Sequence, residues 1–277
     1  MKKRTAALLA AGGAAAGILL AAALDVRLAV RYYTVESDQV DSPIRLAVLT
    51  DLHACRYGKN QEQLVAAVAA QNPDLVLMCG DIVDDEPRME EWRALLTVKK
   101  LADRWPVYYA AGNHEYRTGR LAEIKKLLTA CGAVVLDGKC VRVAAGGQMV
   151  QIGGIDDPET GEENWEAQLS AAGSGLDGSH FSILLTHRPE RVSDYADSGF
   201  DLVLAGHAHG GQWRIPGLIN GLIAPNQGLF PQYAGGAYDL GGGTTMIVSR
   251  GLARESTRVP RLYNPPELVV VDVAPAS

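Results

Sequence analysis

The 277-residue sequence has no excess of basic residues, because 26 lysines and arginines stand against 32 aspartates and glutamates and leave a net charge of −6. It also lacks a stripe of interleaved aromatic and basic residues, so we expect no nucleic-acid partner. Its four cysteines include no Cys-x-x-Cys pair, and although Cys131 and Cys140 are spaced to meet across a hairpin, we expect no disulfide. Hydrophobic residues make up 47% of the chain, which is enough for a sizeable core in one large or two small domains.

The N-terminal segment has no charged residue between Ala6 and Leu24. A basic region, residues 1–4, precedes it and favours an N-terminus inside the cell with the following chain outside. Since about 20 apolar residues span a bilayer, we expect residues 5–24 to be a transmembrane anchor. The alternative is a cleaved signal peptide, because Ala21-Ala22-Ala23 offers a cleavage site. Residues 25–43 are then a linker, and the protein is a single-pass membrane protein with an extracytoplasmic domain, or a secreted protein if the segment is cleaved.

Residues 44–273 alternate between short apolar runs and amphipathic segments, which predicts an α/β domain. Helical spacing of apolar residues follows Asn60 and recurs around Trp92. Residues 134–152 are typical of short strands joined by glycine-rich hairpin turns, and residues 210–243 have no clear period and predict a long irregular insert. The predicted strands cover residues 44–50, 74–79, 107–111, 134–136, 141–143, 149–152, 182–186, 201–205, 244–248 and 268–273.

Potential metal ligands follow several of these strands where each strand ends. Five of the six histidines lie at such junctions, and only His180, which we interpret as structural, lies elsewhere. Open α/β sheets place their ligand sites at the carboxyl ends of their strands, and imidazole and carboxylate groups are ligands of transition metals. The sequence therefore predicts a metal site at one sheet edge, built from Asp51-x-His53, Gly80-Asp81-x-x-Asp84, Gly112-Asn113-His114-Glu115, His187 and Gly206-His207-x-His209.

These motifs, in this order, resemble those of the calcineurin-like metallophosphoesterases. The resemblance covers residues 44–273 and is closest to a bacterial membrane-associated branch, in which the last motif continues as Gly210-Gly211-Gln212. It implies a four-layer α/β/β/α sandwich with two mixed β-sheets.

The resemblance also implies two divalent metal ions, with Asp81 bridging them. Such ligands suit Mn, Fe, Zn, Co or Ni and do not select among these metals. In the family a hydroxide shared by the ions attacks phosphorus, and His114 is expected to act as general acid or to steady the transition-state charge. Asp84 is expected to orient His114 or a ligand. The implied ligand sets are Asp51, His53, Asp81 and His209 for the first ion, and Asp81, Asn113, His187 and His207 for the second.

The sequence therefore predicts a metal-dependent phosphoesterase at the outer face of the cytoplasmic membrane. Its expected substrates are lipid- or cell-wall-linked phosphodiesters, and the alternative within the branch is pyrophosphate cleavage in UDP-2,3-diacylglucosamine. The sequence does not specify an oligomeric state. A non-catalytic metal-binding scaffold is the alternative of another class, and it is disfavoured because no ligand of the family pattern is missing.

Overall fold

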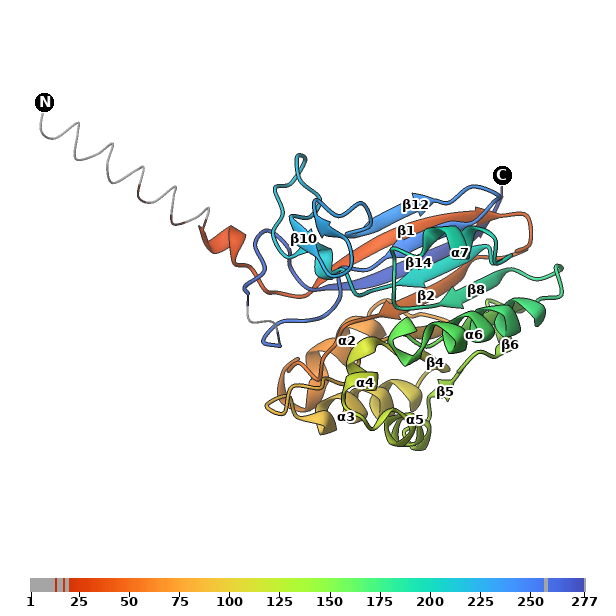
Figure 1. The fold of residues 1–277 in the computed structure, drawn as a ribbon, viewed down its shortest axis with the longest axis horizontal. Coiled ribbons are helices and arrows are strands. Elements are labelled where there is room, and N and C mark those ends of the chain that lie inside the picture. The colour runs from red at the N-terminus through yellow and green to blue at the C-terminus, as the bar shows by residue number, and fades with distance from the viewer. Residues whose placement is uncertain (1–12, 14–16, 18–19, 257–258, 277) are drawn as a thin grey trace, which may run out of the picture.

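Two six-stranded β-sheets form the centre of the computed structural model, which describes residues 13, 17, 20–256 and 259–276 (Figure 1). Sheet 1 has the strand order β1 (Ala29–Ser37), β14 (Glu267–Pro275), β2 (Ile44–Leu49), β3 (Leu75–Cys79), β4 (Val107–Ala110) and β5 (Val134–Val135). Sheet 2 has the order β12 (Gly236–Asp239), β13 (Thr245–Val248), β9 (Leu202–Ala205), β8 (Ser182–Leu185), β7 (Gln148–Gly154) and β6 (Cys140–Ala145). Each sheet contains both parallel and antiparallel pairs, so the predicted pair of mixed sheets is confirmed.

Helices cover the outer face of each sheet and complete the predicted four layers. On sheet 1 lie α2 (Glu62–Ala69), α3 (Glu91–Ala102) and α5 (Leu121–Ala130). On sheet 2 lie α6 (Glu162–Ser174) and α7 (Val192–Ala196). The short helix α4 (Asn113–Arg117) and the 3₁₀ turns η1 (Lys59–Gln61), η2 (Pro158–Thr160) and η3 (His209–Gly211) belong to the connecting loops.

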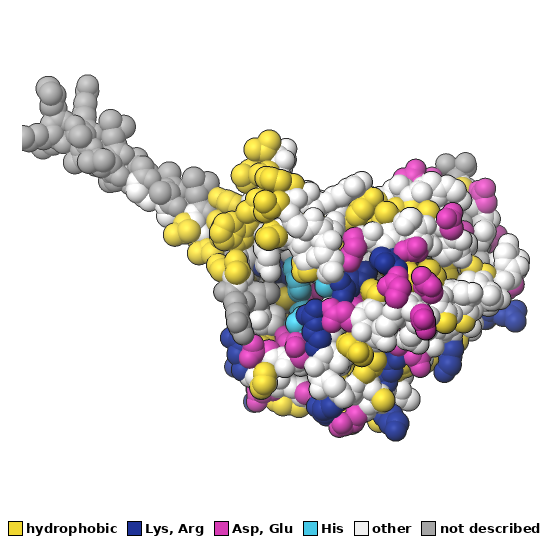
Figure 2. Space-filling view, viewed as in Figure 1, with side chains coloured by type: hydrophobic (Ala, Val, Ile, Leu, Met, Phe, Trp, Pro, Cys, Tyr) yellow, Lys and Arg dark blue, Asp and Glu magenta, His cyan; other side chains and the backbone are white. Residues whose placement is uncertain are grey.

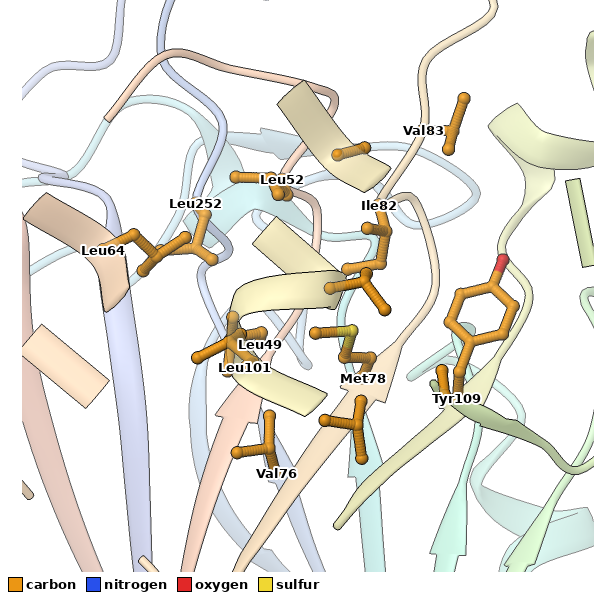
Figure 3. Packing of buried hydrophobic residues seen from close by; sticks show 14 of the residues in the cluster. Leu49, Leu52, Leu64, Val76, Met78, Ile82, Val83, Leu101, Tyr109 and Leu252 are labelled. Carbon is orange, nitrogen blue, oxygen red and sulfur yellow. The ribbon is translucent and has the colours of Figure 1, made fainter. Parts of the chain in front are cut away.

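The apolar runs of the sequence form strands because both faces of each sheet are buried. In β3, Val76 and Met78 point toward the helices, where they pack with Leu101 of α3 (Figure 3). The alternate residues Leu75 and Leu77 point between the two sheets. A strand with two buried faces shows a continuous apolar run in its sequence, and such runs are typical of parallel strands between helical layers.

Three segments differ from the expectations. Residues 29–37, predicted to be part of a linker, form the edge strand β1. This strand pairs in parallel with β14, which lies more than 200 residues later in the sequence, so no local pattern reveals the pairing. The strand at Val134 does not form a hairpin with the next strand but pairs with β4 in sheet 1. The hairpin lies between β6 and β7, where Gly146 and Gly147 both have positive φ, as a two-residue turn of this kind requires. The insert at 210–243 contains β10 (Ile223–Ala224), β11 (Gly228–Leu229) and β12.

Among the described residues, no helix combines the length and the apolar character needed to cross a membrane. Most of the segment predicted to be an anchor, residues 5–24, lies outside the described residues. The four cysteines are unpaired, and Cys79 is fully buried in the core.

Candidate metal centre

The seven predicted ligands all lie in loops that follow the parallel strands at one end of the two sheets. The ligand atoms of Asp51, His53 and His209 lie within 4.8 Å of one another, as do those of Asp81, His187 and His207. His53 also forms such a group with Asp81 and His114, which links the two sets. Asn113 lies between two residues that contact Asp81, because the His114 backbone N–H donates to Asp81 Oδ1 at 2.9 Å and Gly112 packs against the same carboxylate.

Asp81 is at the centre of this arrangement. Its Oδ2 atom lies 2.9 Å from His187 Nε2, 3.7 Å from His53 Nε2 and 4.0 Å from His114 Nε2. Asp51 occupies a corresponding place on the other side, with Oδ1 3.8 Å from His209 Nε2 and 3.9 Å from His187 Nε2. A cation placed between these groups would therefore meet ligands from both sheets.

The backbone at these positions is unusual. Asp51, His53, Asp81, His207 and His209 all have φ between 48° and 66°, in the left-handed region. For a residue with a side chain this conformation costs about 1–2 kcal/mol. Such strain clusters at functional sites, where the surrounding structure holds it in place.

Two glycines allow the loops to approach one another. A Cβ atom on Gly112 would lie 2.2 Å from Asp81 Oδ1, and one on Gly206 would lie 2.6 Å from Asp51 Oδ2. Real Cβ contacts are never so short, so a side chain at either position would displace a carboxylate. The glycines that frame the sequence motifs therefore make room for the ligands.

Glu115 fixes two of the loops to each other. It is fully buried, and its Oε1 accepts hydrogen bonds from the N–H groups of Ile82 at 2.6 Å and Val83 at 2.9 Å. Its Oε2 accepts from the N–H groups of Asp81 and Gly112, both at 2.9 Å. Burial and the Asp81 charge raise the pKa of Glu115, while the backbone N–H groups oppose that shift. The sequence motif contains Glu115, but its anchoring role was not expected.

Hydrogen bonds orient two of the histidines. His187 Nδ1 donates to the carbonyl of Cys79 at 2.8 Å, so in the neutral ring the lone pair is on Nε2, the atom facing Asp81. Asn226 Oδ1 lies 2.9 Å from His207 Nε2 and also accepts from Arg188, which can only donate. The amide is thereby fixed, His207 Nε2 is the donor, and Nδ1 carries the lone pair. A hydrogen-bonded second ring nitrogen of this kind is typical of metal-binding histidines.

A buried ion pair supports Asn226 from behind. Arg188 is buried and binds the Asp157 carboxylate through two N–H groups, and it also contacts Glu159 at 2.9 Å. The position of Arg188 directly after a predicted ligand was the only sequence signal for this support, and Asn226 had none because it lies in the insert.

The charge states of the histidines suit a cation site. Burial lowers the pKa of His209 to about 3 and holds that of His207 well below its usual range, so both rings are neutral. Burial also opposes protonation of His187, but the charges of Asp81 and Asp51 raise its pKa to about 10. The same carboxylate charge would stabilise a metal ion in place of that proton.

His114 lies at the mouth of the site. Its ring packs edge-on against His53, with the centroids 4.5 Å apart, and its Nδ1 contacts Asp85 and lies 3.3 Å from Asp84 Oδ1. Burial opposes its protonation, but the contact with Asp84 and the neighbouring carboxylates raise the pKa of His114 to about 9. Asp84 also lies 3.1 Å from His53 Nδ1, so it contacts both His114 and a predicted metal ligand.

A cleft of about 620 Å³ opens above these side chains. Its lining includes His53, His114, His209, Asp84, Asp85, Pro225 and Val259. Figure 2 shows the histidines at the base of a hollow in the surface. His180 lies elsewhere and pairs with Asp177.

The residues fit two divalent cations. Within the described part of the chain, His53 Nε2 and both amide atoms of Asn113 are buried without a hydrogen-bond partner. An unsatisfied buried polar atom costs about 1–3 kcal/mol, and a coordinated ion would remove that cost. The mixture of imidazole, carboxylate and amide donors suits transition metals.

Residues 44–211 match the family model of the calcineurin-like phosphoesterases. The chain belongs to this family. An uncharacterized metallophosphoesterase of Campylobacter jejuni is 30% identical over 254 residues, which are 88% of this chain and 63% of that protein. The uncharacterized metallophosphoesterase YkuE of Bacillus subtilis is 30% identical over 231 residues, which are 82% of this chain and 77% of YkuE.

The fold of this metallophosphoesterase also occurs in a solved structure. The phosphopantetheinyl hydrolase PptH of Mycobacterium tuberculosis is similar with a TM-score of 0.52 and 13% identity, over 80% of this chain and 96% of that one. The likeness concerns the fold alone. Family membership identifies the protein as a metal-dependent phosphoester hydrolase, as the sequence predicted.

Proposed function

We propose that this metallophosphoesterase binds one divalent ion through Asp51, His53, Asp81 and His209, and a second through Asp81, Asn113, His187 and His207. The observation that carries the proposal is the central position of Asp81, whose Oδ2 faces His53 on one side and His187 on the other. Its other oxygen is occupied by the His114 N–H, so Oδ2 is the atom left to share between two ions.

Two ions bound at such ligands supply an activated water and neutralise charge on the phosphate oxygens. His114 then acts as general acid, because it is the histidine at the cleft mouth and is exposed to an incoming leaving group. Asp84 and Asp85 hold its Nδ1, which directs Nε2 toward the base of the cleft. Positioned proton transfer of this kind contributes about 10²–10⁴-fold to a rate.

We further propose that the enzyme acts at the outer face of the cytoplasmic membrane on lipid- or cell-wall-linked phosphodiesters. The uncharged run from Ala6 to Leu24 and the Gly206-His207-x-His209-Gly210-Gly211-Gln212 motif support this location and branch. Cleavage of a UDP-2,3-diacylglucosamine-type pyrophosphate is the second candidate, because this substrate also carries its phosphate groups on a lipid.

The experiment is hydrolysis of bis-p-nitrophenyl phosphate and p-nitrophenyl phosphate by the full chain, after chelation and then with Mn, Fe, Zn, Co or Ni restored singly. The matched variants are Asp81→Asn, in the centre, and Asp103→Asn, an exposed carboxylate that pairs with Lys99. Metal-dependent hydrolysis that is lost only in Asp81→Asn supports the proposal, and the diester-to-monoester ratio identifies the substrate class. Two bound ions per chain without turnover of either ester would favour the scaffold, and absence of metal binding would refute the ligand sets.

A further inference from the structure

The insert at residues 210–243, which contributes Gln212 and Pro225 to the cleft, is almost free of charge. It contains one basic residue, Arg214, and one acidic residue, Asp239. Across the whole chain 21% of the residues are charged. A surface loop of this length that avoids charge is unusual for a region facing water alone.

Large apolar side chains of the insert point outward. Leu218 is 79% exposed, Leu229 66% and Phe230 64%, which are the highest values among the large hydrophobic residues that the structure describes. We call the set the apolar rim; it comprises Trp213, Ile215, Leu218, Ile223, Leu229 and Phe230. Isolated exposed apolar residues need no explanation, but a contiguous patch marks an interaction surface.

Backbone hydrogen bonds hold the segments that carry the rim side by side. The Leu222 N–H donates to the Trp213 carbonyl at 2.9 Å, and the Phe230 N–H donates to the Leu222 carbonyl at 2.8 Å. Ile223 and Leu229 face each other across the β10–β11 pair. Figure 2 shows hydrophobic side chains gathered over the region of β10, on one side of the histidines.

The rim also lies close to the end of the uncharged N-terminal run. Trp213 forms a bridge with Leu262, and its indole N–H donates to the Pro260 carbonyl at 2.9 Å. The next residue, Tyr263, donates its N–H to the Ala23 carbonyl at 2.7 Å. The last residues of the uncharged run therefore lie beside the rim, where Leu20 and Leu24 are also exposed (Figure 1).

The same hairpin that carries the rim reaches the metal centre. Asn226, between β10 and β11, bonds to His207, and its neighbour Pro225 lines the cleft. Val259 also lines the cleft and is 47% exposed. The β10–β11 hairpin thus connects the rim to the cleft, and Pro225 and Val259 give the cleft lining an apolar component.

We propose that the apolar rim inserts into the acyl-chain boundary of a phospholipid bilayer and so places the cleft at the level of the lipid headgroups. The uncharged run beside the rim supports a bilayer rather than a second copy of the chain, because an anchor emerging there holds the rim against the same membrane. Tryptophan at one edge of an apolar surface is typical of side chains at a membrane interface. This inference goes beyond the proposed hydrolysis and rests only on the proposed membrane location.

The experiment reconstitutes the full chain into phosphatidylcholine vesicles, with or without brominated acyl chains, and measures tryptophan fluorescence. Trp213 is the tryptophan within the rim, and the signal lost in Trp213→Phe isolates its contribution. We expect brominated lipid to quench the Trp213 emission, because an indole at the membrane interface lies close to the acyl chains. The triple variant Leu218→Ser, Leu229→Thr, Phe230→Asn should lose this quenching while it still floats with vesicles and still hydrolyses soluble bis-p-nitrophenyl phosphate.

The control replaces exposed apolar residues outside the insert, Val134→Ser with Met149→Ser, and should leave the quenching unchanged. A chain that floats with vesicles but shows unquenched Trp213 would overturn the rim proposal alone, and a doubled particle mass in detergent would then assign the rim to self-association. A chain that fails to float would overturn both the rim and the membrane location. Hydrolysis of the soluble ester, measured on the same samples, reports on the catalytic proposal independently.

Discussion

The Glu115 carboxylate accepts a hydrogen bond from the Asp81 backbone N–H at 2.9 Å, so a buried acid that contributes no ligand atom holds the central ligand in its left-handed conformation. In Glu115→Gln, one carboxylate oxygen becomes an NH₂ group that faces two backbone N–H donors. We expect the free energy of unfolding to fall by about 2–4 kcal/mol, because hydrogen bonds to a charged group contribute about 1.5–3 kcal/mol each. Urea unfolding followed by circular dichroism measures the change. The exposed Glu123→Gln should be near neutral, and an equally stable Glu115→Gln would contradict the anchoring role.

His114→Gln should retain both metal ions and lose rate. Because a general acid matters most when the leaving group is poor, the loss should reach about 10²–10⁴-fold for an alkyl phosphodiester and be smaller for a p-nitrophenyl ester. Steady-state kinetics with the two leaving groups, beside metal content by mass spectrometry, test this. An equal loss of rate with both esters would assign His114 to charge stabilisation instead. As a control, His180→Gln, outside the centre, should have the rate of the unaltered enzyme.

Gly112→Ala should reduce metal content. The added methyl group would meet Asp81 Oδ1 at 2.2 Å and the Asp81 backbone nitrogen at 2.5 Å, so the ligand must move. Gly173→Ala is the matched control, because that glycine lies in α6 and a Cβ there meets only the Ser198 carbonyl at 3.2 Å. Full metal occupancy in Gly112→Ala would show that the loops tolerate the displacement.

Asn226→Gly should weaken binding of the ion held by His207. Residues that orient a metal-binding histidine typically account for about 10–100-fold in metal affinity. Asn226→Asp keeps an acceptor oxygen for His207 and Arg188, and should restore most of the affinity. Calorimetric titration of the metal-free proteins distinguishes these cases. Identical metal affinities in the unaltered enzyme and both variants would show that Asn226 has no effect on metal binding.

Chelation should lower the unfolding temperature. A ligand at about 100 times its dissociation constant stabilises the native state by about 2.7 kcal/mol, and removing the ions also leaves the carboxylates of Asp51 and Asp81 buried near each other. Differential scanning calorimetry with and without chelator measures the shift. Asp81→Asn should be insensitive to chelator, and a shift of equal size in that variant would place the stabilising ion elsewhere.

The α/β class and the convergence of the ligand loops could be predicted from the sequence because both depend on local signals, whereas the four layers were implied by the family resemblance. A continuous apolar run such as 75–79 indicates a strand buried on both faces. Because ligand sites of α/β sheets lie at the carboxyl ends of the strands, the residues that follow such strands, Asp81, His187 and His207, are expected to meet. The ligand assignment itself remains a prediction that metal binding must test.

What escaped prediction depends on distant partners. β1 has no helical or strict alternating pattern and is a strand because β14 pairs with it. Asn226 is one of several polar residues in a loop without periodicity, and only the folded position of Arg188 distinguishes it. Glu115 was visible in its motif, but three of the four N–H groups that it binds come from a loop 32 to 34 residues earlier.

The position of β14 between β1 and β2 has a consequence for the order of synthesis. The strand that joins β1 to β2 is β14, residues 267–275, which is synthesised last. β1 and β2 therefore cannot become part of one sheet while the chain is still emerging. Long-range pairing of this kind makes folding slow. Sheet 1 is therefore completed only after its last strand is released, whereas the β6–β7 hairpin can form as soon as it emerges. A ribosome or translocon stalled before residue 267 would hold a chain in which β1 is still separate from β2–β5.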